Sequence, residues 1–375
     1  MQKRLALVGS PGSAFLNFRL SFIRLLVKRG VKVICVAPQF SDSEEQILRD
    51  SGAEVFNLGF ARMSISIFEF GRVVFRLVKL FRSKNISHCV SFFHKPNILC
   101  GFACIICKGV KFVPIIEGLG TLFGKNKMLR FWLLRKLLII GYRITLITAK
   151  RVVFLNQFDR TYFVERSIAP VERCELLGPI GVDLKKFNAS GAEVENIGFV
   201  FAGRLLVSKG ILIFQDAVNH LEALGRLSNV EIMVAGEIDE NFDSISADQL
   251  NDIKSNKNIS YLGHCSLSGV LRKGRILVLP TWYREGVPMV LQEAMASGLP
   301  VICTDWPGCR DITIDGYNGL LIPPQDSKAL AKAMIFFLDD CTKVFEFGTN
   351  ARLYAEQNLG SADKNDLLYN FVESS

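Results

Sequence analysis

Two glutamates, Glu285 and Glu293, are separated by seven residues in the segment REGVPMVLQEAMASG. Carboxylates accept hydrogen bonds in pairs, so they suit the hydroxyl groups of a sugar and of a ribose. An amphipathic helix with one exposed glutamate, preceded by another that only complements the helix dipole, would give the same pattern. The residues between the two carboxylates decide which interpretation is favoured.

Those residues predict the start of a helix. Pro288 suits a first helical position because its missing N–H would be unpaired there, and Gly298 suits a left-handed stop after the last turn. We therefore expect the helix to begin near Val287, with free N–H groups that can receive an anion. A phosphate held between two hydroxyl-binding carboxylates is the chemistry of a nucleotide-sugar site.

Two cations on one loop form a second candidate site. The segment VFAGRLLVSKG reads as an apolar strand followed by Gly203 and Arg204, with Lys209 and Gly210 opening a helix. A guanidinium and an ammonium on such a loop could neutralise a diphosphate. Two solvated charges would also fit the loop taken alone, but together with the paired glutamates it favours a diphosphate-containing ligand.

The elements that must position these residues are short apolar strands that alternate with helical patterns along the whole chain. The expected strands are KRLALVG, KVICVAP, HCVSFF, KFVPII and RVVFLN in the first half and IGFVFAG, EIMVAG, ISYLG, ILVLP and PVICT in the second. Such alternation predicts parallel sheets with crossover helices, and two runs predict two Rossmann-like domains. Ligands of open parallel sheets bind beyond the carboxyl ends of the strands, so we expect the active site in a cleft between the domains.

The expected domain boundaries follow from composition. We predict an N-terminal domain at 1–183, a C-terminal nucleotide-sugar domain at 184–355, and a final segment at 356–375. The hinge is expected near Gly181 to Gly198, where the sequence is polar and contains glycine.

The two motifs together resemble glycosyltransferase family four, whose members are retaining enzymes of the GT-B fold. The family signature joins a GR-x-x-x-x-KG loop to a Glu, seven residues, Glu motif and a G-x-P-V strand, and all three occur here in that order. The segment at 9–38 resembles the opening strand, loop, helix and strand of the family. Segments at 92–102, 117–123 and 178–187 are similar to a subgroup that adds N-acetylhexosamines or related sugars to polyprenyl-diphosphate glycolipids. The resemblance covers essentially the full chain, and it implies that the final segment, 356–375, returns to the first domain.

The resemblance implies a metal-independent, retaining hexosyltransferase that moves a sugar from a UDP-sugar to a polyprenyl-diphosphate-linked saccharide in bacterial surface glycan assembly. Glu117 stands where many members have a histidine, and it could act as a base or bind the acceptor. Asp311 is expected to cap a helix near the donor. The implied catalytic residues are Arg204, Lys209, Glu285 and Glu117; the donor-binding residues are Gly12, Gly203, Gly263, Gly286, Val287, Pro288, Met289, Val290 and Glu293; the acceptor-binding residues are Phe15, Arg19, His94 and Lys95. No cofactor and no metal site are implied.

Charge is distributed unevenly along the chain. Residues 1–185 hold 29 Lys and Arg against 12 Asp and Glu, whereas the remainder holds 16 against 24. The cations at 68–84 and 128–149 are interleaved with bulky apolar residues, which is typical of helices in an anionic membrane interface. We therefore expect peripheral attachment to the cytoplasmic face of the inner membrane. A core helix with snorkelling cations is the alternative for 128–149, and a nucleic-acid partner is disfavoured because no compact basic run is present.

The cysteine spacing and the absence of a D-x-D motif argue against redox and metal sites. Cys104 and Cys107 form a C-x-x-C pair in an apolar, helix-like stretch with no second pair nearby, so buried thiols are expected rather than a redox or metal site. No D-x-D motif is present to hold a metal-bridged diphosphate. Two other functions stay open: a non-catalytic nucleotide-sugar or glycolipid-binding protein of the same fold, and a nucleotide-sugar epimerase.

Overall fold

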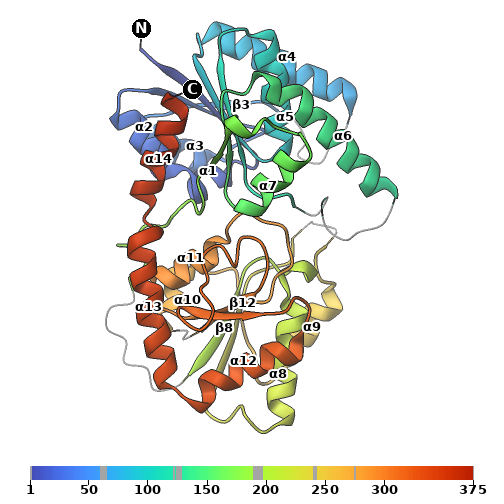
Figure 1. Cartoon of the computed structure of the whole chain (residues 1–375), viewed down its shortest axis with the longest axis vertical. Helices are drawn as coiled ribbons and strands as arrows, with labels where there is room; N and C mark the ends of the chain where they lie inside the picture. Colours follow the sequence, from blue (N-terminus) through green and yellow to red (C-terminus); the bar gives the residue numbers. More distant parts are fainter. Residues whose placement is uncertain are drawn as a thin grey trace. The chain divides into compact units, whose positions relative to one another are not determined.

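The computed structural model describes residues 2–59, 66–120, 123, 129–188, 197–239, 243–273 and 276–374. The chain divides into two units, Met1–Ile180 with Ala362–Ser375, and Gly181–Ser361. Each unit is built on one parallel sheet, of seven strands in the first and six in the second, with helices packed against it (Figure 1). The predicted α/β class with two parallel-sheet domains is confirmed.

The sheet of unit 1 has the strand order β3-β2-β1-β4-β5-β6-β7. From β1 the chain moves outward to β2 and β3, then crosses back to place β4 on the other side of β1. The carboxyl ends of β1 and β4 therefore flank the switch point of the sheet, where ligands of such folds bind. The strands are β1 (Arg4–Val8), β2 (Lys32–Ala37), β3 (Glu54–Asn57), β4 (His88–Phe92), β5 (Lys111–Ile116), β6 (Val152–Phe154) and β7 (Cys174–Leu176).

Both faces of this sheet are buried. Leu5 and Leu7 of β1 belong to one core cluster and Ala6 and Val8 to the other, because successive side chains of a strand point to opposite faces. The first face is covered by α1 (Ser13–Phe18), α2 (Leu20–Lys28), α3 (Asp42–Asp50) and α14 (Ser361–Glu373). The second face is covered by α4 (Ile67–Ser83), α5 (His94–Ile106), α6 (Leu129–Thr145) and α7 (Gln157–Glu165).

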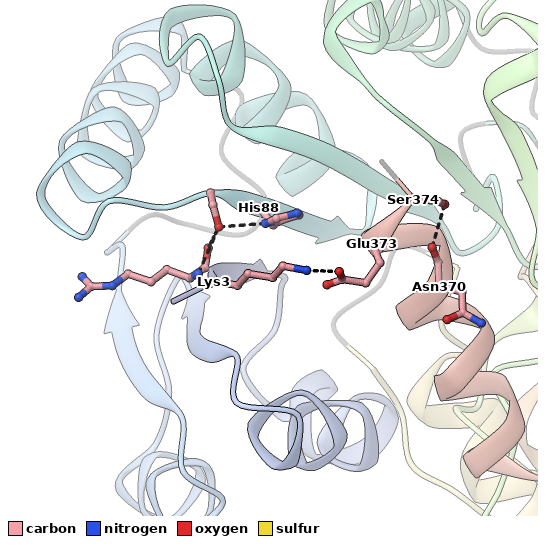
Figure 2. A network of polar contacts seen from close by, with 7 residues as sticks. Lys3, His88, Asn370, Glu373 and Ser374 are labelled. Carbon is pink, nitrogen blue, oxygen red and sulfur yellow. Dashed lines mark hydrogen bonds and ion pairs between the residues drawn. The ribbon is translucent and has the colours of Figure 1, made fainter. Parts of the chain in front are cut away.

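The C-terminal helix α14 packs on unit 1, where the final segment was expected. Lys3, just before β1, forms an ion pair with Glu373 (Figure 2). Arg29 Nη2 lies 2.8 Å from a carboxylate oxygen of Asp366. Leu368 and Val372 are buried in the core cluster of the first face. The last helix is thus part of the first unit in both its apolar and its polar contacts.

The C-x-x-C pair is structural. Cys104 and Cys107 lie at the end of α5 and just after it, and both are buried free thiols. The expectation of buried thiols rather than a redox site is confirmed by this burial. Among the described residues, no group of three or more His, Cys, Asp and Glu is arranged to hold a metal ion.

Unit 2 repeats the design with the strand order β10-β9-β8-β11-β12-β13. The switch point lies between β8 and β11. The strands are β8 (Gly198–Ala202), β9 (Glu231–Ala235), β10 (Ser260–Gly263), β11 (Ile276–Leu279), β12 (Val301–Thr304) and β13 (Gly319–Ile322). One core cluster joins the sheet to α8 (Ile211–Ala223), α9 (Ala247–Ser255) and α12 (Ser327–Asp339), and the other to α10 (Leu267–Lys273), α11 (Met289–Ala296) and α13 (Thr342–Asn358).

Candidate active site

The two predicted donor motifs meet at the switch point of unit 2. Arg204 and Lys209 follow β8, and Glu285 follows β11, its neighbour in the sheet. The loops are joined because the carbonyl of Ser208 accepts hydrogen bonds from the backbone N–H groups of Trp282 and Tyr283, at 2.8 and 3.0 Å. Residues that are 76 positions apart in sequence are thereby held at one edge of the sheet.

Lys209 and Glu285 form a largely buried ion pair. The Lys209 Nζ lies 2.5 Å from Oε1 of Glu285, and the two side chains are only 9% and 20% exposed. The ammonium also lies 5.7 Å from the ring centre of Tyr283. A lysine this buried keeps a fixed position, so its charge is preorganised for an anion at the edge of the site.

Arg204 is the second cation of the site and is more open. Its Nη1 lies 2.7 Å from Oδ2 of Asp239, and its side chain is 43% exposed. Its guanidinium carbon lies 5.8 Å from the ring centre of Tyr283. The ring of Tyr283 therefore has both cations beside it, at 5.7 and 5.8 Å from its centre.

Asp239 and Tyr283 were not predicted. Asp239 lies in the loop after β9, the strand on the other side of β8. The acidic run EIDENFD directly after a predicted strand is the signal that could have identified this loop. For Tyr283, the available signal was an aromatic residue directly before Arg284 and Glu285 in the motif.

The helix of the second motif begins later than predicted. Helix α11 starts at Met289, and Pro288 precedes it with φ −56° and ψ 126°. The expected start at Val287 is wrong because the extended ψ of Pro288 keeps that residue outside the helix. Pro288 also has no N–H, so it cannot donate to a donor phosphate as the segment Gly286 to Val290 was expected to. For the other N–H groups of that segment, contact with sugar and phosphate stays a prediction. Gly298 has φ +73°, which confirms the left-handed stop.

Glu293 lies on α11, where burial raises the pKa of its carboxyl to about 7, an effect that the charge of Lys186 opposes. The preceding residue, Gln292, is fully buried. Its Oε1 accepts from the N–H of Gly181 at 2.9 Å, and its Nε2 donates to the carbonyl of Val287 at 3.1 Å. Gln292, which the sequence reasoning missed, thus fixes the turn that leads into the helix carrying Glu293.

Glycines hold the site loops of unit 2 together. Three of them have positive φ and approach a carbonyl oxygen of a neighbouring loop so closely that a Cβ atom would collide with it. A Cβ atom on Gly236 would lie 1.9 Å from the carbonyl oxygen of Gly203, and one on Gly308 would lie 1.9 Å from that of Gly286. A Cβ atom on Gly210 would lie 2.1 Å from the carbonyl oxygen of Pro280. The N–H of Gly236 also donates to the carbonyl of Gly263 at 2.8 Å. The predicted donor-binding glycines Gly203, Gly263 and Gly286 therefore belong to one set of packed loops.

Asp311 has a different role from the one expected. Its carboxylate accepts a hydrogen bond from the N–H of Gly308 at 2.7 Å and so closes a turn between β12 and β13. No helix begins at this residue, so the expectation of a helix cap is wrong. The turn is the one that places Gly308 against Gly286.

In unit 1, two predicted residues are packing residues. Phe15 is 0% exposed and makes edge-to-face contacts with Phe40 and Phe92. The prediction that Phe15 contacts an acceptor is wrong, because its side chain is enclosed in the core behind the loop. Gly12 precedes α1, and a Cβ there would lie 2.8 Å from the carbonyl oxygen of Gln39. The small size of Gly12 is thus already required by packing within unit 1.

Arg19 and Glu117 come together in unit 1, where Glu117 directly follows β5. They form an ion pair in which the side chains are 2% and 10% exposed. Burial raises the pKa of Glu117, and the positive charge and hydrogen bond of Arg19 oppose that shift. The Nε of Arg19 is buried without a hydrogen-bond partner in the described part of the chain. The pair joins one predicted acceptor residue to one predicted catalytic residue, which the sequence alone did not indicate.

His94 is engaged through both ring nitrogens. Nδ1 lies 2.7 Å from the hydroxyl of Tyr142, and Nε2 lies 3.2 Å from the carbonyl of Leu119. The second contact requires a proton on Nε2, and burial lowers the pKa of the ring, so a neutral tautomer fits this geometry. His94 thus supports the loop that carries Glu117, which favours a positioning role over direct acceptor contact. Lys95 follows it in the first turn of α5, partly exposed.

Known glycosyltransferases are similar to this chain in sequence. Residues 196–340 match the family described as "Glycosyl transferases group 1". The chain is 26% identical over 355 residues to the N,N'-diacetylbacillosaminyl-diphospho-undecaprenol alpha-1,3-N-acetylgalactosaminyltransferase of Campylobacter jejuni, covering 90% of each chain. It is 23% identical over 202 residues, 51% of each chain, to the UDP-Gal:alpha-D-GlcNAc-diphosphoundecaprenol alpha-1,3-galactosyltransferase of Escherichia coli.

Solved structures share the whole fold. A glycosyltransferase from Rickettsia africae superposes with a TM-score of 0.79 at 15% identity, covering 99% of this chain and 98% of that one. The Anabaena protein Alr3699/HepE in complex with UDP superposes with a TM-score of 0.77 at 16% identity, covering 100% of both chains. The chain therefore contains a group 1 glycosyl transferase domain at residues 196–340 and has the GT-B fold of its structural neighbours.

Proposed function

We propose that this chain transfers a sugar, an N-acetylhexosamine, from a UDP-sugar to a polyprenyl-diphosphate-linked saccharide during assembly of a bacterial surface glycan. The observation that carries the donor part is the pair of cations beside Tyr283, with Glu285 in contact with Lys209. The acceptor class is supported by the name of the Campylobacter jejuni relative, which spans nearly the same length. The surface glycan is proposed to be an O-antigen, a capsule or a glycan attached to protein.

The proposed mechanism assigns each donor-site residue a separate task. Arg204 and Lys209 neutralise the charge that develops on the departing diphosphate. Glu285 accepts hydrogen bonds from hydroxyls of the donor sugar, and Glu293 accepts them from the ribose. The N–H groups of the turn before α11 contact phosphate and sugar.

Transfer is proposed to retain the anomeric configuration by attack on the same face from which the diphosphate leaves. A phosphate oxygen of the donor takes the proton of the acceptor hydroxyl, so no protein nucleophile is needed. Glu117 is proposed to accept a hydrogen bond from the acceptor or, in place of that phosphate oxygen, to take the proton of its hydroxyl. Burial raises the pKa of this carboxyl, which makes it a stronger base. Arg19 holds that carboxylate in place.

The test is transfer by the purified full-length chain to a short-chain polyprenyl-diphosphate-linked monosaccharide. UDP-GlcNAc, UDP-GalNAc, UDP-glucose and UDP-galactose are compared, with and without EDTA, and the anomeric configuration of the product is read by NMR. We expect one UDP-N-acetylhexosamine to give an α-linked disaccharide, equally well with EDTA. Binding of UDP-sugar without transfer would favour a binding protein, and isomerised free UDP-sugar would favour an epimerase.

Attachment to an anionic membrane through unit 1 is also part of the proposal. Within the part of the chain that the structure describes, no helix has both the length and the apolar composition needed to cross a bilayer. Helix α6 does expose apolar side chains, among them Leu129 at 70%, Leu137 at 64% and Trp132 at 50%. These outward-facing apolar residues favour an interfacial helix over an ordinary core helix for this segment. Peripheral binding at the cytoplasmic face would bring the chain to a lipid-linked acceptor.

A further inference from the structure

The loop after β9 is bound tightly to the cationic loop after β8. The N–H of Leu205 donates to the carbonyl of Glu237 at 3.0 Å, and the N–H of Ile245 donates to the carbonyl of Leu205 at 3.0 Å. The N–H of Asp239 donates to Ser244 Oγ at 2.9 Å. Backbone contacts on both sides of Asp239 therefore fix its position beside the diphosphate site.

Two carboxylates of this loop have different partners. Asp243 accepts from the N–H and the hydroxyl of Ser208, both neutral groups, and so holds the backbone of the cationic loop. Asp239 instead contacts the guanidinium of Arg204 at 2.7 Å. The first contact is structural, whereas the second occupies a cation that the proposed reaction requires.

The pair between Arg204 and Asp239 is accessible to a ligand. The two side chains are 43% and 25% exposed, in contrast to the more buried pair of Lys209 and Glu285. A diphosphate that approaches Arg204 would meet a carboxylate already bound to it. Two anions cannot share a guanidinium group without repelling one another, so the carboxylate and the ligand compete.

We propose that Asp239 is an internal competitor of the diphosphate for Arg204. In the free enzyme it holds the guanidinium in place; on donor binding it yields that contact to the diphosphate, and it favours release of UDP afterwards. This inference rests on the proposed function, since it takes Arg204 to bind the diphosphate of the donor. Asp239 thus tunes the affinity for the diphosphate and does not contact the reacting sugar.

The experiment measures binding of UDP, uridine and inorganic pyrophosphate by calorimetry to the wild type and to Asp239→Asn. Removing the competing charge of a half-exposed pair is expected to tighten UDP and pyrophosphate binding about 3- to 10-fold and to leave uridine binding unchanged. Asp252→Asn, which removes the same charge from an exposed position on α9, is expected to behave as the wild type. Thermal melts of each variant establish that the fold is kept.

A double variant decides whether the effect passes through Arg204. In an Arg204→Ala background, Asp239→Asn is expected to change UDP binding less than 2-fold. Equal or weaker UDP and pyrophosphate binding in Asp239→Asn alone would overturn the proposal, and so would an unchanged gain in the Arg204→Ala background. Failure of the wild type to bind UDP would instead contradict the proposed function, while pyrophosphate would still report the competition at Arg204.

Discussion

Lys209 has a fixed position because Glu285 pairs with it and the neighbouring loops enclose it. Its substitution should therefore remove a preorganised charge from the site and leave Glu285 without this cation. Lys209→Ala is expected to reduce the turnover of sugar transfer by about 10²- to 10³-fold, because one stabilising group for the leaving diphosphate is lost. The measurement is steady-state transfer at saturating UDP-sugar.

The matched control for this prediction is Lys332→Ala, which removes an exposed lysine from α12 of the same unit. We expect wild-type turnover from it. Turnover within 5-fold of the wild type in a folded Lys209→Ala variant would show that this ammonium does not act on the leaving group.

Burial of the Glu293 carboxylate lowers the free energy of unfolding at alkaline pH, and its proposed function in binding the ribose explains why a carboxylate is buried there. Folding raises the pKa of this carboxyl from 4.5 to about 7. Between pH 4.5 and about 7, the carboxyl is therefore protonated in the folded protein and ionised in the unfolded chain. Stability contributed by this group is therefore present at low pH and is lost as the pH rises through 7. Glu293→Gln should remove the loss, raising the Tm by about 2–4 °C at pH 8 and leaving it nearly unchanged at pH 5.

The same variant should lose much of the stabilisation that UDP gives to the wild type, since a neutral amide offers one accepting oxygen to the ribose hydroxyls where a carboxylate offers two charged ones. For the wild type, UDP affinity should fall as the pH is lowered through about 7, because the protonated carboxyl is a poorer acceptor. Differential scanning fluorimetry across this range, with and without UDP, checks both expectations. A lower Tm at pH 8, or an undiminished UDP shift, would contradict the assignment.

Among the elements, the loops at the edge of the second sheet depend on glycine contacts. A Cβ on Gly236 would lie 1.9 Å from the carbonyl oxygen of Gly203, and its φ of +148° also disfavours other residues. Gly236→Ala should push the loops after β8 and β9 apart. We expect a loss of about 1–3 kcal/mol in the free energy of unfolding and at least 10-fold weaker UDP binding.

Gly269→Ala is the control, because a Cβ at this position of α10 meets open space. It should leave UDP binding unchanged and keep or slightly raise stability, as alanine favours a helix. Chemical denaturation and calorimetry measure the two quantities. Wild-type stability and UDP affinity in Gly236→Ala would show that the two loops can separate without consequence.

The strands and the donor motifs could be predicted from sequence because they are local. Apolar runs bounded by glycine identify β8 and β11, and the spacing of Lys209 and Glu285 belongs to one recognisable signature. Burial and pairing are not local. The helical pattern around Phe15 does not say which face turns inward, and no spacing rule states that Arg19 meets Glu117.

The ion pair between Asp239 and Arg204 could not be predicted from sequence for the same reason. Its strand, β9, neighbours β8 in the sheet, yet the sequence does not reveal which acid of the following loop reaches Arg204. The start of α11 was misplaced for a related reason, since Pro288 is compatible with both the first helical position and the residue before it.

For the molecule as a whole, the excess of positive charge in the first half of the chain coincides with helices whose apolar residues face outward. On α4, one exposed stripe alternates aromatic and basic residues at helical spacing: Phe68, Arg72, Phe75, Lys79 and Arg82. On α6, exposed Lys136 and Arg143 lie among exposed Trp132, Leu137 and Ile140. Both helices pack against α5 on one face of the first sheet (Figure 1). Apolar side chains that enter the interface and cations that meet anionic headgroups would act together on this face.

Leu137→Glu tests this arrangement, because it places a negative charge in the middle of the exposed apolar face of α6. Sedimentation with vesicles of phosphatidylglycerol and phosphatidylcholine should show at least 10-fold weaker binding than the wild type, since one buried leucine is worth about 1.5–3 kcal/mol and the new charge repels the surface. Phe345→Glu, at a residue 64% exposed on α13 of unit 2, is the control and should bind as the wild type does. High salt should weaken wild-type binding by screening the cations. Equal losses in both variants would mean that adding an acid anywhere reduces binding, and unchanged binding in Leu137→Glu would remove α6 from the membrane contact.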